Sequence, residues 1–212
     1  MNKLNNIFDK VYVISYEGSN RIKNLPNNLK DLDYEIFYGC NKNDLDIDEL
    51  KIKGYKRASG LDSMSLGVFA CAFSHLFLYR ELKKNNMNNI LILEDDAILI
   101  EKNIDYTVEC YKNLPTDWDV FFLGYKGVDV DINYKNMYKG EGYMMGDFRL
   151  KILGCTHAFA INNNFLNMLL TRQENPETFG GSEFWELFYK LNYFSVINKC
   201  FLQDVSPSLI GW

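Results

Sequence analysis

Three consecutive carboxylates interrupt an apolar run near the middle of the chain. In the stretch NNILILEDDAILIEKN, residues 88–103, Glu94, Asp95 and Asp96 lie between two hydrophobic segments. Adjacent acids repel one another, and burial of a charge is costly unless something compensates it. Carboxylate oxygens are hard ligands that suit Mg²⁺ or Mn²⁺, and both ions commonly bind substrate phosphates as well. The cluster therefore predicts a site for a divalent cation.

The spacing of the acids indicates which of them act together. Successive side chains of an extended strand point to opposite faces, so Glu94 and Asp96 point the same way while the chain stays extended, and Asp95 points oppositely. A solvated strand end with a helix cap is the alternative for such a run. The apolar AILI that follows makes the acids a polar break inside a hydrophobic segment, which favours a functional role.

Strand and helix patterns alternate along the chain around these acids. Strands are expected at 10–16, 34–39, 89–94, 119–125, 155–162 and near 194–203, and helices within 18–32 and over 65–86, 104–114, 163–174 and 180–192. Residues 126–151 show no clear period and are expected to form a long functional loop or lid. The alternation predicts an α/β fold, with a mostly parallel central sheet flanked by helices on both faces and ligands beyond the carboxyl ends of the strands.

Composition and charge restrict the class of protein. The 212 residues suit a single domain that spans 1–212, and the formal net charge of -5 argues against a nucleic-acid partner. No apolar run reaches the roughly 18 residues of a membrane-spanning helix, so no transmembrane segment is expected. The five cysteines are widely spaced and include no CxxC pair. They indicate reduced core thiols and a cytoplasmic location.

Four blocks of the sequence together resemble glycosyltransferase family 25, the lipopolysaccharide-type and collagen-type galactosyl and glucosyl transferases. The blocks are VYVISYEGSNRIKNL trailed by FYGCNKNDL, then LGVFACAFSHLFLYRELKKNN, then ILILEDDAIL, and finally LGCTHAFAINNNFLNMLL followed distantly by SPSLI. The second and third blocks in tandem are specific to the family. Together the four blocks span nearly the whole chain.

The resemblance implies a GT-A fold, which is Rossmann-like, and a metal-dependent transfer of a hexose with inversion. The implied donor is a nucleotide sugar, most often a UDP-sugar, and the acceptor is a hydroxyl of a glycan or glycoprotein. Asp96 would ligate Mn²⁺ or Mg²⁺, and Glu94 or Asp95 would reach the ribose or a second metal position. The physical logic agrees, because a metal that bridges both phosphates neutralises the leaving nucleoside diphosphate without proton transfer.

The first β-to-α loop and the turn YGCN would hold the nucleotide in this resemblance. Arg21 is suited to bidentate contact with phosphate, and the turn, with Gly39 and Asn41, lets the backbone approach the base or ribose. An exposed cation at a helix start is the alternative for Arg21. A strand-ending turn is the alternative for Gly39.

The resemblance also makes Ser74 and His75 candidates for the donor site. Both lie on the helix that precedes the acids. A buried histidine that is only hydrogen-bonded in the core is an equally good interpretation of His75. For His157, in CTHAF, the structural role is the favoured one.

The catalytic base is the place where the sequence departs from the family pattern. The family commonly shows Pro-Val-Asp before its late helix, whereas this chain has TFGGSEFWELF, so the acid would be Glu183. Compensation of a helix dipole is the alternative for that residue. The other candidates for the base are Glu186, Asp147 and Asp204.

Two other functions would use the same fold or the same acids. A metal-dependent phosphoesterase or nucleotidyltransferase commonly draws on further Asp or His ligands, and this chain has two histidines. A catalytically silent module for carbohydrate binding or assembly is the second alternative, which the missing Pro-Val-Asp keeps open.

Overall fold

A computed structural model of the chain describes residues 2–55, 66–127, 133–135, 137–139, 153–176, 179 and 191–204. Its strands are β1 (Lys10–Ser15), β2 (Glu35–Tyr38), β3 (Ile90–Glu94), β4 (Ala97–Leu99), β5 (Val120–Gly127), β6 (Asn133–Tyr134), β7 (Met137–Lys139), β8 (Leu153–Ile161), β9 (Tyr193–Val196) and β10 (Phe201–Gln203). Its helices are α1 (Leu25–Leu29), α2 (Ile47–Ile52), α3 (Leu66–Lys84), α4 (Ile104–Lys112) and α5 (Asn163–Gln173), with the short 3₁₀ turns η1 (Lys3–Asn6), η2 (Ile22–Asn24), η3 (Lys42–Asp44) and η5 (Glu101–Asn103).

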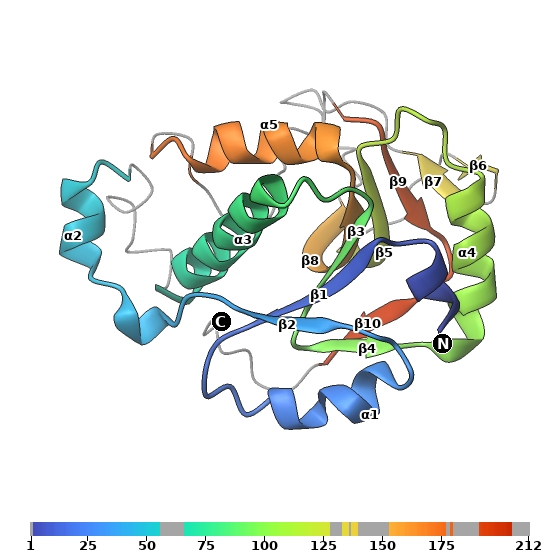
Figure 1. The fold of residues 1–212 in the computed structure, drawn as a ribbon, viewed down its shortest axis with the longest axis horizontal. Helices are drawn as coiled ribbons and strands as arrows, with labels where there is room; N and C mark the ends of the chain where they lie inside the picture. The colour runs from blue at the N-terminus through green and yellow to red at the C-terminus, as the bar shows by residue number, and fades with distance from the viewer. Residues whose placement is uncertain are drawn as a thin grey trace.

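An eight-stranded sheet in the order β2-β1-β3-β8-β5-β9-β7-β6 forms the centre of the molecule (Figure 1). β1 pairs in parallel with β2 and β3, and β5 pairs in parallel with β9. β8 is antiparallel to β3 and β5, and β7 is antiparallel to β9 and β6. β8 and β7 therefore run against all the other strands of the sheet, and the predicted mostly parallel α/β sheet is confirmed.

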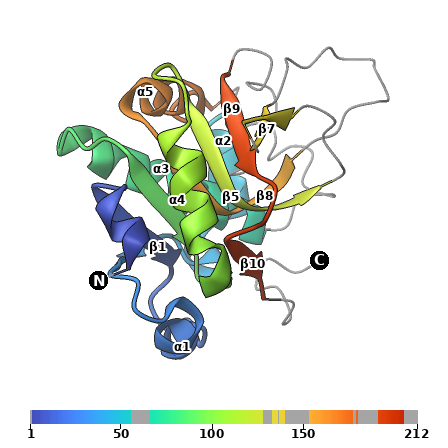
Figure 2. The same ribbon diagram turned by 90° about the vertical axis from the view of Figure 1, so that its right-hand side faces the viewer.

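Helices cover both faces of the sheet, as predicted. Val11 and Val13 of β1 belong to a core that includes residues of α1 and α4, whereas Tyr12 and Ile14 belong to a second core with residues of α3 and α5. This alternation follows from the two-residue period of a strand. Figure 1 shows α3 and α5 next to each other, and in Figure 2 α5 and α1 lie at opposite ends of the view with the sheet between them.

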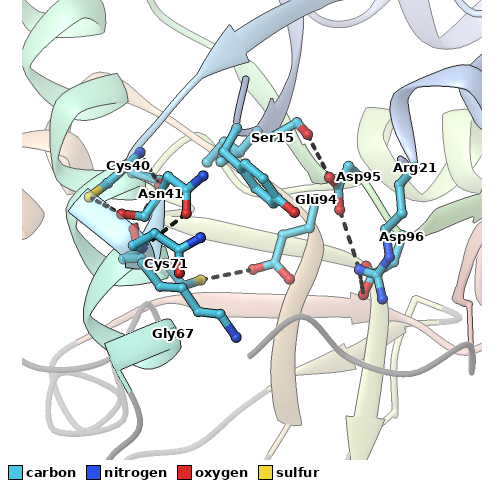
Figure 3. A pocket seen from close by; sticks show the side chains of 15 residues that line it. Ser15, Arg21, Cys40, Asn41, Gly67, Cys71, Glu94, Asp95 and Asp96 are labelled. Atoms are coloured by element: carbon cyan, nitrogen blue, oxygen red, sulfur yellow. Dashed lines mark hydrogen bonds and ion pairs between the residues drawn. The ribbon is translucent and has the colours of Figure 1, made fainter. Parts of the chain in front are cut away.

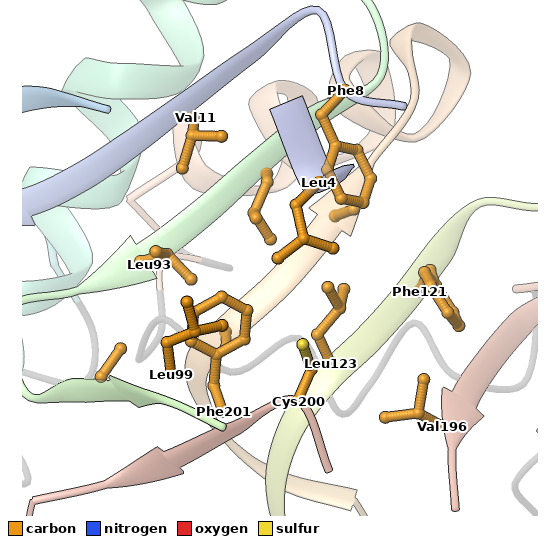
Figure 4. Packing of buried hydrophobic residues seen from close by; sticks show 14 of the residues in the cluster. Leu4, Phe8, Val11, Leu93, Leu99, Phe121, Leu123, Val196, Cys200 and Phe201 are labelled. Atoms are coloured by element: carbon orange, nitrogen blue, oxygen red, sulfur yellow. The ribbon is translucent and has the colours of Figure 1, made fainter. Parts of the chain in front are cut away.

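A two-stranded sheet closes the first of these cores. β4 pairs antiparallel with β10, which follows it by about half the chain. Leu99 of β4 and Phe201 of β10 lie near Leu93 and Leu123 of the large sheet (Figure 4). The segment after the acids is therefore anchored by burial on one side and by strand pairing on the other.

Some expectations about the elements were wrong. Part of the loop expected over 126–151 forms β6 and β7, and the single strand expected near 194–203 is split into β9 and β10, which belong to different sheets. The short strand β4 was not expected at all. Strands of two to four residues are too short to show an alternating pattern in the sequence. Most of the helix expected over 180–192 lies outside the described residues.

The described helices include none with both the length and the apolar character that crossing a membrane requires.

Candidate active site

A cleft lies at the edge of the sheet where β1, β2 and β3 end. Ile14 is paired with Glu94, and Ser15 is paired with Tyr38, so the carboxyl ends of the three parallel strands meet at one place. The cleft contains about 770 Å³ of empty space and is open to solvent. The loops after β1 and β2, the first half of α3 and the three acids line it (Figure 3). The acids thus lie at the rim where the sequence places them.

The three carboxylates do not keep the directions expected for an extended chain. β3 ends at Glu94, and Asp95 and Asp96 form a turn that leads into β4. Glu94 faces α3, whereas Asp95 and Asp96 both face Arg21 (Figure 3). Glu94 and Asp96 were expected to point the same way while the chain stays extended, but the chain turns at Asp95 and Asp96, and the alternation of side chains ends at Glu94.

Asp95 fastens the loop after β1 to the end of β3. Its Oδ2 accepts hydrogen bonds from the hydroxyls of Ser15, at 2.6 Å, and Ser19, at 2.9 Å. Its Oδ1 accepts a longer hydrogen bond, 3.3 Å, from Nη1 of Arg21. Both carboxylate oxygens therefore have donors within this loop, which compensates for the burial of the charge.

Asp96 is the less compensated of the two buried acids. Its Oδ2 accepts hydrogen bonds from Nη1 of Arg21, at 3.2 Å, and from Nε2 of Gln203, at 3.0 Å. Its Oδ1 is buried without a hydrogen-bond partner in the described part of the chain. Burial, together with the nearby charge of Glu94, raises the pKa of Asp96 to about 7. A cation next to Oδ1 would remove this penalty.

Arg21 is placed between the acids and the cleft. Its Nη1 forms ion pairs with both Asp95 and Asp96, and its side chain is 15% exposed. The structure thus shows Arg21 balancing the charge of the acids, and its contact with phosphate stays a prediction.

Gly39 and Ser74 form a close contact between the end of β2 and α3. A Cβ atom on residue 39 would lie 2.3 Å from Oγ and 2.4 Å from Cβ of Ser74. The Ser74 hydroxyl donates to the carbonyl of Ala70, at 2.7 Å, and accepts from the N–H of Cys40, at 2.9 Å. The structure explains this glycine by the approach of α3, which is a different reason from the predicted approach of a nucleotide.

We expect Gly39→Ala to lower the thermal stability of the protein, because the added methyl overlaps Ser74. Overpacking of this kind costs about 1–3 kcal/mol, and each kcal/mol corresponds to roughly 2–4 °C in Tm for a chain of this size. Calorimetry or thermal fluorescence measures the loss. Ser74→Gly removes the atoms that clash, so the double variant should recover part of the Tm relative to the sum of the single changes. Additive losses would show that the contact with Ser74 is not the cause.

Asn41 lines the cleft and also shapes its wall. The side-chain oxygen of Asn41 accepts a hydrogen bond from the N–H of Asn43, at 3.0 Å, and so caps η3. This local bond holds the chain after β2 along the cleft, next to Lys42. Asn41 therefore lies in the wall of the cleft, and its contact with a nucleotide stays a prediction.

His75 reaches the cleft only through Glu94. Its side chain is 0% exposed, its Nε2 lies 3.2 Å from Oε1 of Glu94, and its Nδ1 lies 3.3 Å from the hydroxyl of Tyr79. Sγ of Cys71 lies 3.8 Å from the same Glu94 oxygen. A direct contact between His75 and a donor is therefore not supported by this geometry.

The remaining candidates lie elsewhere or outside the described residues. His157 is 1% exposed, and a Cβ on Gly124 would lie 2.4 Å from its Nε2, so this ring is packed against β5 as a structural role requires. Glu183, Glu186 and Asp147 are outside the described residues. The N–H of Asp204 donates to the carbonyl of Asp96, at 2.7 Å, which places Asp204 beside the turn of the acids.

Several residues of the site were not predicted. Ser15 and Ser19 bind Asp95, Gln203 binds Asp96, and Tyr79 contacts His75. Ser15 is the last residue of β1 and Ser19 lies in the loop that follows, where donors to a ligand or an acid often lie, so this signal could have identified them. Gln203 is separated from Asp96 by 107 residues and carries no such signal.

A family model for "Glycosyltransferase family 25 (LPS biosynthesis protein)" matches residues 8–175, which include most of the cleft. The chain belongs to glycosyltransferase family 25. Procollagen galactosyltransferases 1-B and 1-A of Xenopus laevis are each 26% identical to it over 136 residues. This match covers 58% of the chain and 22% of each family relative, so the chain spans about a fifth of their length.

Two solved structures resemble the fold of this family 25 member over most of its length. One is A197 from STIV, with a TM-score of 0.46 and 12% identity over 93% of this chain and 95% of that one. The other is a glycosyltransferase involved in the glycosylation of the major capsid of PBCV-1, with a TM-score of 0.48 and 8% identity over 94% of both chains.

Proposed function

We propose that this family 25 protein transfers a hexose, galactose or glucose, from a UDP-sugar to a hydroxyl of a glycan or protein acceptor, with Mn²⁺ or Mg²⁺ at Asp96. The observation that carries the proposal is the buried Oδ1 of Asp96, which has no hydrogen-bond partner among the described residues and belongs to a residue that lines an open cleft. The family membership and the names of the two Xenopus laevis relatives support the same class of reaction.

The residues of the cleft fit a hard divalent ion. Mg²⁺ and Mn²⁺ are commonly held by one or two carboxylates together with substrate phosphates and water, so a full cage of protein ligands is not required. Asp96 would be the first ligand, and Glu94 would either join it or contact the ribose. The ion would supply neutralisation of the diphosphate as it leaves. Both oxygens of Asp95 already accept hydrogen bonds and Oε1 of Glu94 already contacts His75, so Glu94 and Asp95 both stay candidates for the ribose or second metal position.

The other side chains of the cleft hold the donor in position. Asp95, through Ser15 and Ser19, fixes the loop that carries Arg21. We propose that Arg21 turns one edge of its guanidinium to the diphosphate, where it stabilises the developing negative charge. Asn41 and the backbone of the YGCN turn would contact the base or ribose.

Inversion at the anomeric carbon requires a base on the side opposite the diphosphate. A base there takes the proton of the acceptor hydroxyl as its oxygen attacks, while the bond to the diphosphate breaks. The acids that bind the metal cannot reach that side. We keep Glu183 as the proposed base, and we include in the proposal the cytoplasmic location that the cysteine pattern of the sequence favours.

A screen of nucleotide sugars tests the proposed function. UDP-galactose, UDP-glucose and donors with other nucleotides are compared by thermal shift and by donor hydrolysis, with and without Mn²⁺. We expect one UDP-hexose to raise the Tm of the protein and to be hydrolysed by it, both only when Mn²⁺ is present. Cleavage of phosphodiesters without turnover of any sugar nucleotide would contradict the proposal, and binding without turnover would indicate a silent module.

Arg21→Ala is expected to weaken UDP binding. A charge-assisted hydrogen bond contributes about 1.5–3 kcal/mol, so the dissociation constant should rise by roughly 10-fold to 150-fold. Isothermal titration with UDP and Mn²⁺ measures the change. Arg21→Lys is the matched control, because it keeps the positive charge but loses the planar fork, and it should bind with intermediate affinity. Equal UDP affinity of the parent and Arg21→Ala would show that Arg21 only pairs with the acids and does not contact UDP.

A further inference from the structure

A thiol, an imidazole and a carboxylate meet between α3 and the end of β3. Cys71 and His75 are four residues apart and therefore project from one face of α3. Glu94 faces both of them, with its Oε1 3.2 Å from Nε2 of His75 and 3.8 Å from Sγ of Cys71. One ligand atom from each residue lies within 4.8 Å of the other two, an arrangement that in the described part of the chain occurs only here.

We propose that Cys71, His75 and Glu94 form a second metal site, for a thiolate-binding, tetrahedral divalent cation of the Zn²⁺ class. Thiolate and imidazole ligands select such an ion over Mg²⁺ and Mn²⁺, which prefer oxygen. The inference concerns metal binding without any donor present. It therefore does not depend on the sugar transfer proposed above.

Two of the three distances between ligand atoms are close to those that a tetrahedral ion imposes, and the third, between Cys71 and His75, is at most 4.8 Å. With usual zinc bond lengths, a nitrogen and an oxygen ligand lie about 3.3 Å apart, and a sulfur and an oxygen ligand about 3.5 Å apart. The His75 to Glu94 distance of 3.2 Å already matches the first value, and the Cys71 to Glu94 distance of 3.8 Å is slightly longer than the second. Small adjustments of the Cys71 side chain would complete the site, and its thiol proton would leave to solvent.

The surroundings of His75 suit a metal ligand. A histidine that binds a metal through one nitrogen usually donates the hydrogen of the other to a fixed acceptor. The hydroxyl of the fully buried Tyr79, 3.3 Å from Nδ1, is in place to accept it.

The fourth position of the ion would face the cleft. His75 is fully buried behind the site, whereas Cys71 and Glu94 both line the cleft. A water molecule or a hydroxyl of a bound ligand could therefore complete the tetrahedron.

Cobalt spectroscopy tests the site on the whole chain. Co²⁺ titrated into the metal-free protein should give the near-ultraviolet charge-transfer band of a thiolate ligand and the intense visible bands of tetrahedral cobalt. Cys71→Ser should lose the charge-transfer band and weaken Zn²⁺ binding by more than roughly 100-fold, the upper range for loss of an outer-sphere partner. Cys40→Ser is the matched control from the same cleft, and it should keep the band, as should Asp96→Asn.

Alkylation of the parent protein provides a second measurement that needs no variant. Zn²⁺ should slow the reaction of Cys71 with iodoacetamide, followed by mass spectrometry, and leave that of Cys40 unchanged. The proposal would be overturned if the parent protein lacks the charge-transfer band, or if the band persists in Cys71→Ser. It would also be overturned if the band disappears in Cys40→Ser or Asp96→Asn, or if Zn²⁺ protects both thiols equally. The three residues would then be a hydrogen-bonded group without a metal. Sugar transfer that fails while the band is present would contradict the proposed function only.

Discussion

Asp96→Asn is expected to lower metal-dependent sugar transfer by about 10³-fold or more and to leave the protein folded. A metal that stabilises the leaving diphosphate lowers the activation barrier by several kcal/mol. Since each 1.36 kcal/mol changes the rate tenfold, loss of the main metal ligand should have a large effect. Initial rates at saturating donor, with Mn²⁺ varied from zero, measure the loss. Asp105→Asn is the matched control, because that aspartate is 74% exposed on α4 and pairs with Lys3.

The same substitution should not destabilise the metal-free protein. A carboxyl group whose pKa is higher in the folded protein than in the unfolded chain destabilises the fold when it ionises. The contribution of Asp96 to the free energy of unfolding therefore falls as the pH rises from 3.8, the usual pKa, to about 7, the pKa in the folded protein. At a pH above this raised pKa, Asp96→Asn removes an ionised group that is only partly compensated. The Tm of the variant should be no lower than that of the parent, and Mn²⁺ should raise only the parent's Tm.

Two results would contradict this account of Asp96. Transfer by Asp96→Asn within a few-fold of the parent would show that the carboxylate is not a metal ligand. Full activity of the parent in excess chelator would show that no dissociable metal takes part. A large fall in the Tm of the variant would instead assign Asp96 a structural role through Arg21 and Gln203.

Glu183→Gln is expected to keep UDP-sugar binding and to lower transfer by about 10² to 10⁴, the range typical of general base catalysis. The amide has nearly the same shape as the carboxylate but cannot accept the proton of the acceptor hydroxyl. The measurement is transfer to a genuine acceptor at saturating donor, with donor affinity determined separately. Glu174→Gln is the matched control, because that glutamate is 50% exposed and pairs with Arg80, and this variant should transfer normally.

Asp204 is the competing candidate within the described residues. Its N–H donates to the carbonyl of Asp96, which places it on the side of the metal-binding acids. An inverting base must lie on the opposite side of the sugar, so Asp204→Asn should affect transfer less than Glu183→Gln does. Near-normal transfer by Glu183→Gln would assign that residue to the helix dipole and move the search to Asp204 and Asp147.

The long strands and helices could be predicted because the pattern of apolar residues within each of them indicates the type of element. The apolar run that ends at Glu94 predicts a covered strand, and residues 65–86 predict a buried helix by their spacing. The structure has both, as β3 and α3. The strand β4 and the break between β9 and β10 could not be predicted, since β4 and β10 have only three residues each and pair with each other across half the chain.

The position of the site could be predicted, but its internal contacts could not. Strand order and polarity place the three acids at a ligand-binding edge. The separate directions of Glu94 and Asp96 depend on a turn that the neighbouring apolar residues do not reveal. The contact between Cys71, His75 and Glu94 depends on how α3 docks against β3, which is a matter of tertiary packing and not of local sequence.

The pairing of β4 with β10 has a consequence for how the protein is made. The side chain of Gln203 and the N–H of Asp204 reach the turn of the acids only after more than a hundred further residues have followed it out of the ribosome. Until then, the buried carboxylates Asp95 and Asp96 have as partners only the side chains at and after the end of β1. Contacts between distant parts of a chain form late and slowly, so the cleft becomes able to hold a ligand at the end of folding and not at its beginning.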